Sequence, residues 1–298
     1  MSDEKYKINN ELWPLFESFT EYFKEFSKDL LSNDDLNKMF DLVLKATVIK
    51  SFEFTLLCIN SKSDDIFFMT PALRGICEEY IVERFLWDKY EDADERNSLI
   101  LMWQQYGILK SSISQWSYFT INKPDQRLYY DESFSNKLKQ AKEDIKRHFK
   151  RQFPKSNFKS TFPSIYFMAK ETGLTEMYQY LYHSASTFVH FNPQNLFRMS
   201  WGNNPHMTFS TAHFKYYYND FIIYYGAMLF CELSEWQASI GKLSDFDTDT
   251  IATIRKVIKG VSRWPELVTF EEMNIGVLSR NLFYKSPGMQ GDEGSFLG

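Results

Sequence analysis

Residues 70–87 read TPALRGICEEYIVERFLW, a stretch in which apolar side chains surround two charged ones at helical spacing. Arg74 and Glu78 are four residues apart, so on a helix they lie one above the other on the same face. The flanking Leu, Ile, Val and Phe residues indicate that this face points into the fold. Because a buried charge without a partner is costly, we expect the pair to belong to a polar site inside a helical protein.

A second stretch, residues 178–193, reads YQYLYHSASTFVHFNP and carries Ser186 and His190 at the same spacing. Its apolar and aromatic neighbours again indicate an inward face, on a helix expected over residues 174–191. The two pairs place four polar residues in two inward stripes. They therefore imply one shared site.

The composition favours a globular protein. With 28 Phe, 18 Tyr and 7 Trp among 298 residues, the interior is expected to be filled mainly by aromatic rings, and 12 Gly and 9 Pro are too few for a disordered or turn-rich chain. The net charge of -5 disfavours a protein that coats nucleic acid non-specifically, although a local basic patch is compatible with it.

The protein is expected to be soluble and cytoplasmic. Its first residues, MSDEKYKINN, are polar and do not resemble a signal peptide. The longest uncharged apolar run, residues 221–231, is shorter than the roughly 20 residues that a membrane-spanning helix needs, so no membrane association is expected. Cys58, Cys77 and Cys231 lie far apart in apolar sequence, which is typical of reduced, buried thiols.

Helical periodicity predicts an all-α fold, a multi-helix bundle with one short β-hairpin near residues 197–210. Thr70 and Pro71 are expected as the N-cap and first residue of a helix that ends near Tyr90. Further helices are expected over residues 10–31, 34–59, 91–120, 133–152, 164–171, 174–191, 212–243 and 249–261.

The same pattern suggests the domain organisation. We expect one helical domain over residues 1–285 and a flexible polar tail over residues 286–298. Residues 122–160 are more charged than their surroundings. They are expected to form a charged helical excursion from the bundle, or alternatively to join two helical halves.

Several motifs of known chemistry are absent from the sequence. It contains no Gly-rich phosphate loop, no C-x-x-C pair, no H-E-x-x-H and no G-x-S-x-G, which disfavours P-loop nucleotide hydrolysis, a Cys-rich zinc site, zincin proteolysis and the serine hydrolase elbow. A metal held by His and carboxylates stays an open alternative, but His183 and His190 are about two helical turns apart, too far for one ion to bridge comfortably. We expect neither a metal nor a cofactor.

Each polar pair has a functional and a structural interpretation. In the functional one, Arg74 binds an anionic group such as a phosphate, and Glu78 orients it or acts as a base. His190 is then a general base or phosphate ligand, with Ser186 as its hydrogen-bond partner. In the structural one, Arg74 and Glu78 form an internal ion pair that holds helices in register, and His190 is a core histidine bonded to Ser186 or Glu78.

Four further residues are candidates for substrate binding. Asn192 either caps the next helix or adds an amide to the site, and Tyr182 either lines a pocket or packs in the core. Lys146 and Arg147 belong to a basic run, residues 137–159, whose interleaved aromatic residues are Phe149, Phe153 and Phe158. The run suits stacking on single-stranded nucleic acid, or it is a surface helix whose Phe residues dock on the core while its charges stay in water.

With these residues in view, the chain resembles a bacterial family of uncharacterised helical proteins. Members carry Arg-x-x-x-Glu in an early helix and Ser-x-x-x-His at the end of a later one. These motifs match Arg74 and Glu78 in ALRGICEEY, and Ser186 and His190 in SASTFVHFNP. The match covers about residues 40–240, and each motif is short. The arrangement is also loosely similar to the HEPN superfamily of helical bundles.

Many HEPN proteins are dimeric, metal-independent ribonucleases of toxin–antitoxin and antiviral defence loci. The resemblance therefore implies a homodimer that engages RNA or a nucleotide, with a protein partner in a defence complex as a further expectation. The superfamily's signature, an Arg followed by four to six residues and a His, has no match here, since Arg147 and His148 are adjacent. Ribonuclease chemistry would have to combine Arg74 with His190 from separate helices.

Two other functions fit the same residues. The protein could be a non-enzymatic helical scaffold or regulatory subunit of a bacterial defence complex, whose polar cluster only fixes helix register. It could instead be a small-ligand sensor with an aromatic-lined pocket. The high aromatic content also indicates a homo-oligomer, because a monomer of this size is not expected to hide all of that surface.

Overall fold

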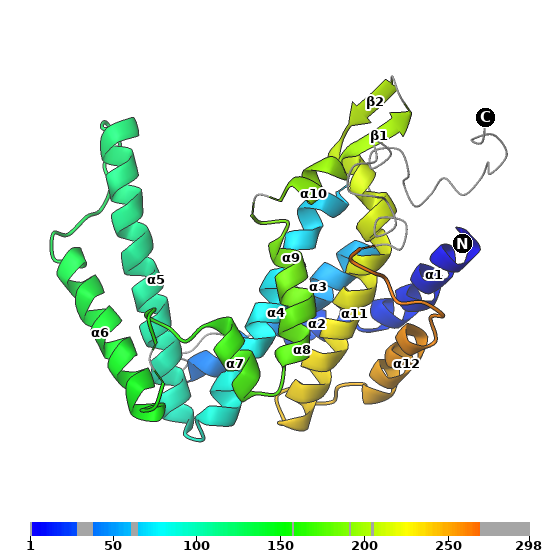
Figure 1. Ribbon diagram of the computed structural model, residues 1–298. Coiled ribbons are helices and arrows are strands. Elements are labelled where there is room, and N and C mark those ends of the chain that lie inside the picture. The colour runs from blue at the N-terminus through cyan, green and yellow to red at the C-terminus, as the bar shows by residue number, and fades with distance from the viewer. Residues whose placement is uncertain are drawn as a thin grey trace. The chain divides into compact units, whose positions relative to one another are not determined.

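The computed structural model describes residues 2–28, 38–60, 65–156, 158–190, 192–203 and 206–268. Its elements are almost all helical, so the all-α, multi-helix fold class is confirmed (Figure 1). In chain order the longer helices are α1 (Ser2–Ser18), α2 (Thr20–Phe26), α3 (Met39–Asn60), α4 (Ile66–Lys89), α5 (Ala93–Asn122), α6 (Phe134–Gln152), α7 (Ile165–Glu171), α11 (Lys215–Ser239) and α12 (Thr248–Lys259). Between α7 and α11 lie the shorter elements α8 (Thr175–Met177), η2 (Tyr178–Tyr182), α9 (His183–Ser186), α10 (Pro193–Phe197), β1 (Ser200–Asn203), β2 (His206–Phe209) and η3 (Thr211–Phe214).

The chain divides into two compact units. Unit 1 consists of residues 1–29, 44–80 and 175–298, and unit 2 of residues 30–43 and 81–174. Helices α3 and α4 each contribute residues to both units. The expectation of one domain over residues 1–285 stays a prediction, and the tail expected over residues 286–298 lies outside the described residues.

The core of unit 1 is built from aromatic rings on helices that are far apart in the sequence. Phe16 of α1 and Phe23 of α2 pack against Phe230 of α11, with ring centroids 5.1 and 5.9 Å apart. Phe23 also stacks on Phe52 of α3 at 4.5 Å. The apolar run over residues 221–231 thus serves as the central strip of a helical core, and burying its rings supplies much of the driving force for folding.

Helices α3 and α11 approach each other closely. A β-carbon at Gly226 of α11 would lie 3.2 Å from the ring of Phe54, so the missing side chain makes the close approach possible. Deeper along the same pair, the amide of Gln237 donates to the carbonyl of Leu44 at 2.8 Å. This hydrogen bond satisfies the amide nitrogen of a side chain that is fully buried, while its oxygen has no partner among the described residues.

A network of ion pairs attaches α12 to α11. Arg255 of α12 donates from Nε and Nη2 to the two carboxylate oxygens of Glu235, at 2.5 and 2.6 Å, and from Nη1 to Glu232 at 2.9 Å. The side chains are half-buried. A guanidinium that engages one carboxylate with two parallel bonds is stronger than an ordinary surface pair.

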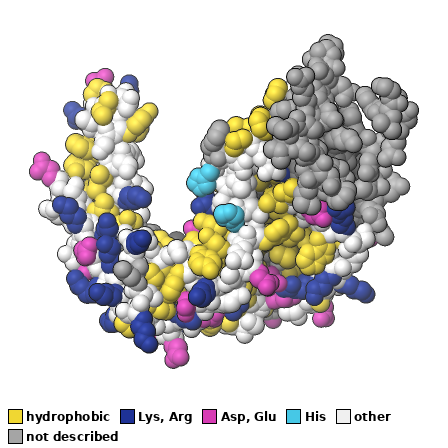
Figure 2. All heavy atoms as spheres, in the orientation of Figure 1, with side chains coloured by type: hydrophobic (Ala, Val, Ile, Leu, Met, Phe, Trp, Pro, Cys, Tyr) yellow, Lys and Arg dark blue, Asp and Glu magenta, His cyan; other side chains and the backbone are white. Residues whose placement is uncertain are grey.

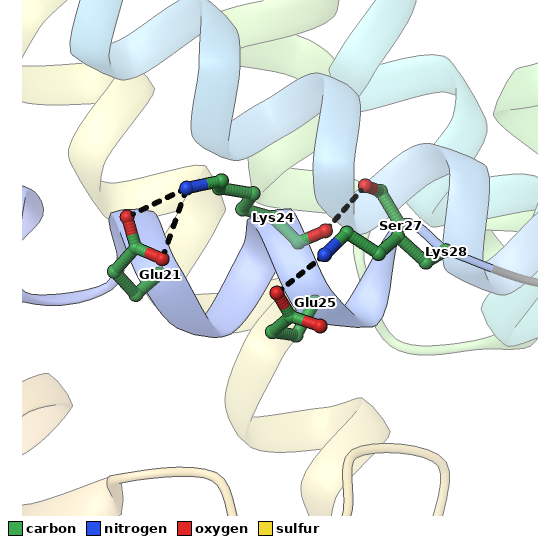
Figure 3. A network of polar contacts seen from close by, with 5 residues as sticks. All are labelled: Glu21, Lys24, Glu25, Ser27 and Lys28. Atoms are coloured by element: carbon green, nitrogen blue, oxygen red, sulfur yellow. Dashed lines mark hydrogen bonds and ion pairs between the residues drawn. The ribbon is translucent and has the colours of Figure 1, made fainter.

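The outer face of α2 carries weaker pairs. Lys24 lies 3.1 Å from Glu21, Lys28 lies 2.5 Å from Glu25, and the hydroxyl of Ser27 donates to the carbonyl of Lys24 at 2.9 Å (Figure 3). All of these side chains are exposed, so the pairs add little to stability. They mark the solvent side of the helix.

Unit 2 contains the helical hairpin of α5 and α6, which lie side by side (Figure 1). The side chain of Asp92 caps α5 by accepting the backbone N–H of Asp94 at 3.1 Å. At the base of the hairpin, Phe153 stacks on Phe85 of α4 with centroids 5.6 Å apart. The charged excursion expected near residues 122–160 lies in this unit.

A two-stranded antiparallel hairpin lies within the predicted range 197–210. Strands β1 and β2 pair Ser200 with Phe209 and Asn203 with His206. None of the helices in the described part of the chain is both long and apolar enough to span a membrane.

The predicted start of the helix that carries Arg74 is wrong. α4 begins at Ile66, and Thr70 and Pro71 lie inside it rather than at its N-terminus. Extending the helix backwards buries Ile66 and Thr70 completely, and the Thr70 hydroxyl donates to the carbonyl of Ile66 at 2.7 Å. Burial of these residues outweighs the preference of Pro for the first helical position.

Candidate functional site

Arg74 lies on the part of α4 that belongs to unit 1, and its side chain is half-buried. Its Nη2 donates to the hydroxyl of Tyr182 at 3.0 Å, and the guanidinium carbon is 5.0 Å from the centroid of the Tyr182 ring. Its Nε is buried and has no hydrogen-bond partner in the described part of the chain. Since a guanidinium offers five N–H donors, Arg74 retains most of its capacity to bind an anion.

Tyr182 is the last residue of η2, a five-residue π-helical turn that begins at Tyr178. Such turns are rare and are frequent at functional sites. The rings of Tyr178 and Tyr182, at the two ends of this turn, stack with centroids 4.8 Å apart and planes inclined by 18°. The ring of Tyr182 therefore contacts both Tyr178 and Arg74.

Glu78 lies one turn along α4 from Arg74 and is half-buried. Burial raises the pKa of its carboxyl, and the neighbouring Glu79 raises it further, while the cations Arg74 and Lys50 lower it. Among the described residues no ion pair joins Arg74 to Glu78, so the internal ion pair of the structural interpretation is not formed. Arg74 is bonded to Tyr182 instead.

Lys50 of α3 completes the charged group. Its Nζ lies 2.6 Å from Oε1 of Glu79, while Oε2 of Glu79 is buried and has no partner in the described residues. Gly75 lies beneath this cation, because a β-carbon there would be 3.5 Å from Nζ. The site thus holds two cations and two carboxylates, and the sequence motifs identified only half of them.

The second polar pair does not face inward as predicted. α9 ends at Ser186, so the helix expected over residues 174–191 is too long. The hydroxyl of Ser186 donates to the carbonyl of Tyr182 at 2.7 Å rather than to the imidazole of His190. Only the backbone N–H of His190 reaches the carbonyl of Ser186, at 3.2 Å. The side chain of His190 is exposed, so the interpretation as a core histidine is wrong.

The early end of α9 has a local cause. The hydroxyl of Thr187 donates to the carbonyl of Ser184 at 2.7 Å, and the amide of Asn195 donates to the carbonyl of Thr187 at 2.9 Å. These side chains use carbonyls that a continuing helix would need. The chain therefore turns, and Figure 2 shows histidine side chains at the surface of this part of the molecule.

Asn192 caps the next helix, which was one of its two predicted roles. Its side-chain oxygen accepts the backbone N–H of Gln194 at 3.0 Å, and Pro193 is the first residue of α10. Tyr182, the other candidate beside the second pair, orients Arg74. One predicted substrate contact is thus a helix cap, and the other holds the site's main cation.

Lys146 and Arg147 lie on α6, in unit 2. They pair with Glu143 at 3.7 Å and with Asp144 at 3.2 Å, one turn back on their own helix. Figure 2 shows the Lys and Arg side chains along this hairpin. Arg147 is largely exposed and has room to contact an anion.

The Phe residues of the basic run dock on the core of unit 2. Phe149 is buried, and the ring of Phe153 packs between Phe85 and Phe167 at 5.6 and 5.3 Å. Phe158 contacts Phe167 at 5.0 Å. The surface-helix interpretation is therefore correct for these rings, and they are not a platform for stacking bases.

A comparison with models of protein families identifies the family of this chain. A model described as a family of unknown function (DUF5677) matches residues 54–207, just over half of the chain. The chain belongs to this family. The matched region of this DUF5677 protein includes α4, the π-helical turn and α9, and therefore both sequence motifs. No curated protein and no solved structure matches the chain.

Within the described residues, no group of three or more His, Cys, Asp or Glu side chains is arranged to hold a metal ion. The chemistry available at the site of this DUF5677 protein is that of a guanidinium, a carboxyl with a raised pKa and aromatic rings. A guanidinium is suited to binding an anion with a flat set of acceptor oxygens, such as a phosphate or a carboxylate.

Proposed function

We propose that this protein binds RNA or a nucleotide through a phosphate group, with Arg74 as the phosphate contact. The supporting observation is the state of the guanidinium, which is half-buried, rests on Tyr182 and makes a single hydrogen bond among the described residues. A half-buried cation with unused donors is costly in the free protein. A phosphate oxygen would satisfy those donors and gain charge-assisted bonds.

Glu78 and His190 have distinct roles in this proposal. Glu78 orients the guanidinium by charge, and its raised pKa makes it able to hold a proton nearer neutral pH than an exposed carboxyl does. His190 contacts a phosphate from the solvent side of the site. In the catalytic form of the proposal, His190 is the acid–base of a metal-independent ribonuclease. Ser186 acts only through Tyr182, to which it is bonded.

We further propose a cytoplasmic, HEPN-like role in defence or stress, as a homodimer that works with a protein partner. The support is the helical fold together with the Arg-x-x-x-Glu and Ser-x-x-x-His motifs within the DUF5677 match. The basic face of α6, including Lys146 and Arg147, offers phosphate contacts on unit 2.

A scaffold function is the second candidate, and one contact favours it. The hydrogen bond from Arg74 to Tyr182 joins segments 108 residues apart in the sequence, which is what a purely structural tie would do. In this view, removing Arg74 lowers stability and changes no binding property.

Binding to labelled RNA tests the first proposal. Fluorescence anisotropy with a fluorescein-labelled single-stranded RNA should show at least about tenfold weaker binding by Arg74→Lys, since Lys keeps the charge but lacks the forked geometry. Arg84→Lys is the matched control, because Arg84 lies on the same helix and pairs with Asp88 at 3.3 Å. Equal affinity of Arg74→Lys and the parent protein would sink the proposal.

Two further measurements separate the forms of the proposal. Native mass spectrometry of the purified protein detects a co-purifying nucleotide, which the nucleotide form requires and the scaffold form does not. RNA cleavage by the parent and by His190→Gln tests the catalytic role. Unchanged cleavage by a folded His190→Gln protein would remove His190 from the chemistry while leaving the binding site intact.

A further inference from the structure

The distal half of the α5–α6 hairpin has no core of its own. Between Leu109 on α5 and Ile145 on α6, which are both buried, no residue is buried. Helices in proteins are held mainly by packing of their apolar faces. When two helices pack only on each other, each helix buries only one side. The apolar side chains on the other sides of the hairpin therefore face water.

The inner side of α5 packs on α6 and the connecting loop. Leu109 is buried, Ile113 is half-buried, and Trp116 stacks on Tyr130 with centroids 4.2 Å apart. These three positions of α5 are spaced by four and three residues and so share one face. The inner face of α5 is therefore already covered by α6 and the connecting loop of the same chain.

The opposite side of α5 carries a second stripe that nothing in the described chain covers. Its residues follow one another at spacings of four and three, and all are exposed: Gln104, Ile108, Ser111, Gln115, Tyr118 and Asn122. Ile108 is 58% exposed and Tyr118 is 63% exposed. Alternating steps of four and three residues are the spacing of a seam along which two helices pack.

The outer stripe also lacks charge. It contains no Asp, Glu, Lys or Arg, and Lys110 is the single charged residue of α5 beyond Arg96. The solvent face of a surface helix normally carries charges. Charged residues are depleted and tyrosine is enriched in the centres of protein interfaces. The stripe is therefore uncharged and exposed, and Ile108 and Tyr118 are its two large apolar side chains.

We propose that the outer stripe of α5 packs against the same stripe of a second copy of this chain, so that the two α5 helices lie side by side with α6 on the far side of each. A two-fold interface places a surface against itself. A charged stripe would bring like charges together, whereas this uncharged one does not. The second copy covers the side of α5 that otherwise faces water. The inference rests on the homodimer of the proposed function, for which it names the interface, and it does not depend on the Arg74 site.

A nucleic acid fits this stripe less well than a second copy does. Binding to phosphates needs cations along the contact, and the stripe has none. The basic residues of the hairpin lie on α6, where Lys146 and Arg147 are found.

Sedimentation velocity on the full chain across a dilution series tests the proposal. The parent protein should be dimeric, and Tyr118→Glu should raise the dimer dissociation constant at least about 30-fold, as expected for a central aromatic residue of an interface. Tyr129→Glu is the matched control, since Tyr129 is 85% exposed but lies in the loop after α5. A parent that is monomeric at every concentration, or a Tyr118→Glu protein that dimerises like the parent, overturns the proposal.

Disulfide trapping tests the contact between the two outer stripes independently. The native Cys58, Cys77 and Cys231 are all buried, so they contribute little background. Of four single substitutions to Cys along the stripe, at Ile108, Ser111, Gln115 and Tyr118, at least one should give a disulfide-linked dimer on mild oxidation. Lys139→Cys, on the exposed side of α6, should not. Failure of all four, or equally fast linkage of Lys139→Cys, overturns the proposal.

RNA binding by the same variants tests whether a nucleic acid, rather than a second copy of the chain, occupies the outer stripe. Tyr118→Glu should lower dimer mass and leave the affinity per subunit for labelled RNA within about twofold of the parent. A loss of RNA affinity with unchanged mass would assign the stripe to nucleic acid and overturn the proposal. Arg74→Lys should leave the dimer mass unchanged, so failure at one site is distinguishable from failure at the other.

Discussion

The contact between Arg74 and Tyr182 can be measured by a double-mutant cycle. Tyr182→Phe removes the hydroxyl that accepts from Nη2 at 3.0 Å but keeps the ring that stacks on Tyr178. Arg74→Met removes the charge and keeps much of the apolar length. A hydrogen bond to a charged group contributes about 1.5–3 kcal/mol. Because Arg74 is only half-buried, we expect a coupling energy at the lower end of this range, about 1.5 kcal/mol.

The assay is urea unfolding of the two single variants, the double variant and the parent, followed by far-UV circular dichroism. Tyr180→Phe provides a control cycle with Arg74→Met, because the hydroxyl of Tyr180 donates to the carbonyl of Pro265 at 3.3 Å and does not bond to Arg74. That cycle should give no coupling. If the Tyr182 cycle gives none either, Tyr182 does not hold the guanidinium, and the site described here is wrong.

Three further perturbations have expected outcomes. Arg255→Met should lower the free energy of unfolding by about 1–2 kcal/mol in calorimetry, because it removes the pairs with Glu232 and Glu235; an unchanged melting temperature would contradict this. Burial raises the pKa of Glu78 above its unfolded value of about 4.5, so stability falls as the pH rises from there through the raised folded pKa, and over that range the free energy of unfolding of Glu78→Gln should increase relative to the parent in urea titrations. Burial raises the pKa of Cys77 to about 12, so iodoacetamide should label it in urea and not in the native protein, as read by mass spectrometry; rapid native labelling would refute its burial.

Helix ends that depend on neighbouring residues were predictable from the sequence. Asp92 caps α5 next to residue 91, where that helix was expected to begin, and Asn192 caps α10 directly before Pro193. Thr70 and Pro71 led to a wrong helix start, because their pattern of an N-cap residue followed by Pro lies inside α4. What decides between the two cases is whether the preceding residues are buried, and burial depends on elements that are distant in the sequence.

The candidate site, like the helix ends, could be predicted only where it depends on residues that are close together in the sequence. The spacing of Arg74 and Glu78 gives the helix face that they share, but it does not say what lies opposite. Tyr182 and Lys50 come from other segments, and a π-helical turn leaves no mark in a pattern read at α-helical spacing. His190 was misplaced because residues 187–189 turn away from the helix.

The order of segments in unit 1 affects how the chain can fold during synthesis. Its core needs α11, yet α3 is finished at Asn60 and α11 begins only at Lys215. All of residues 81–174 emerges from the ribosome in between. A growing chain therefore carries the aromatic faces of α1 and α3 without their main packing surface until late in translation. Chaperone capture of truncated nascent chains should be strongest before Lys215 is made and should fall once α11 has emerged.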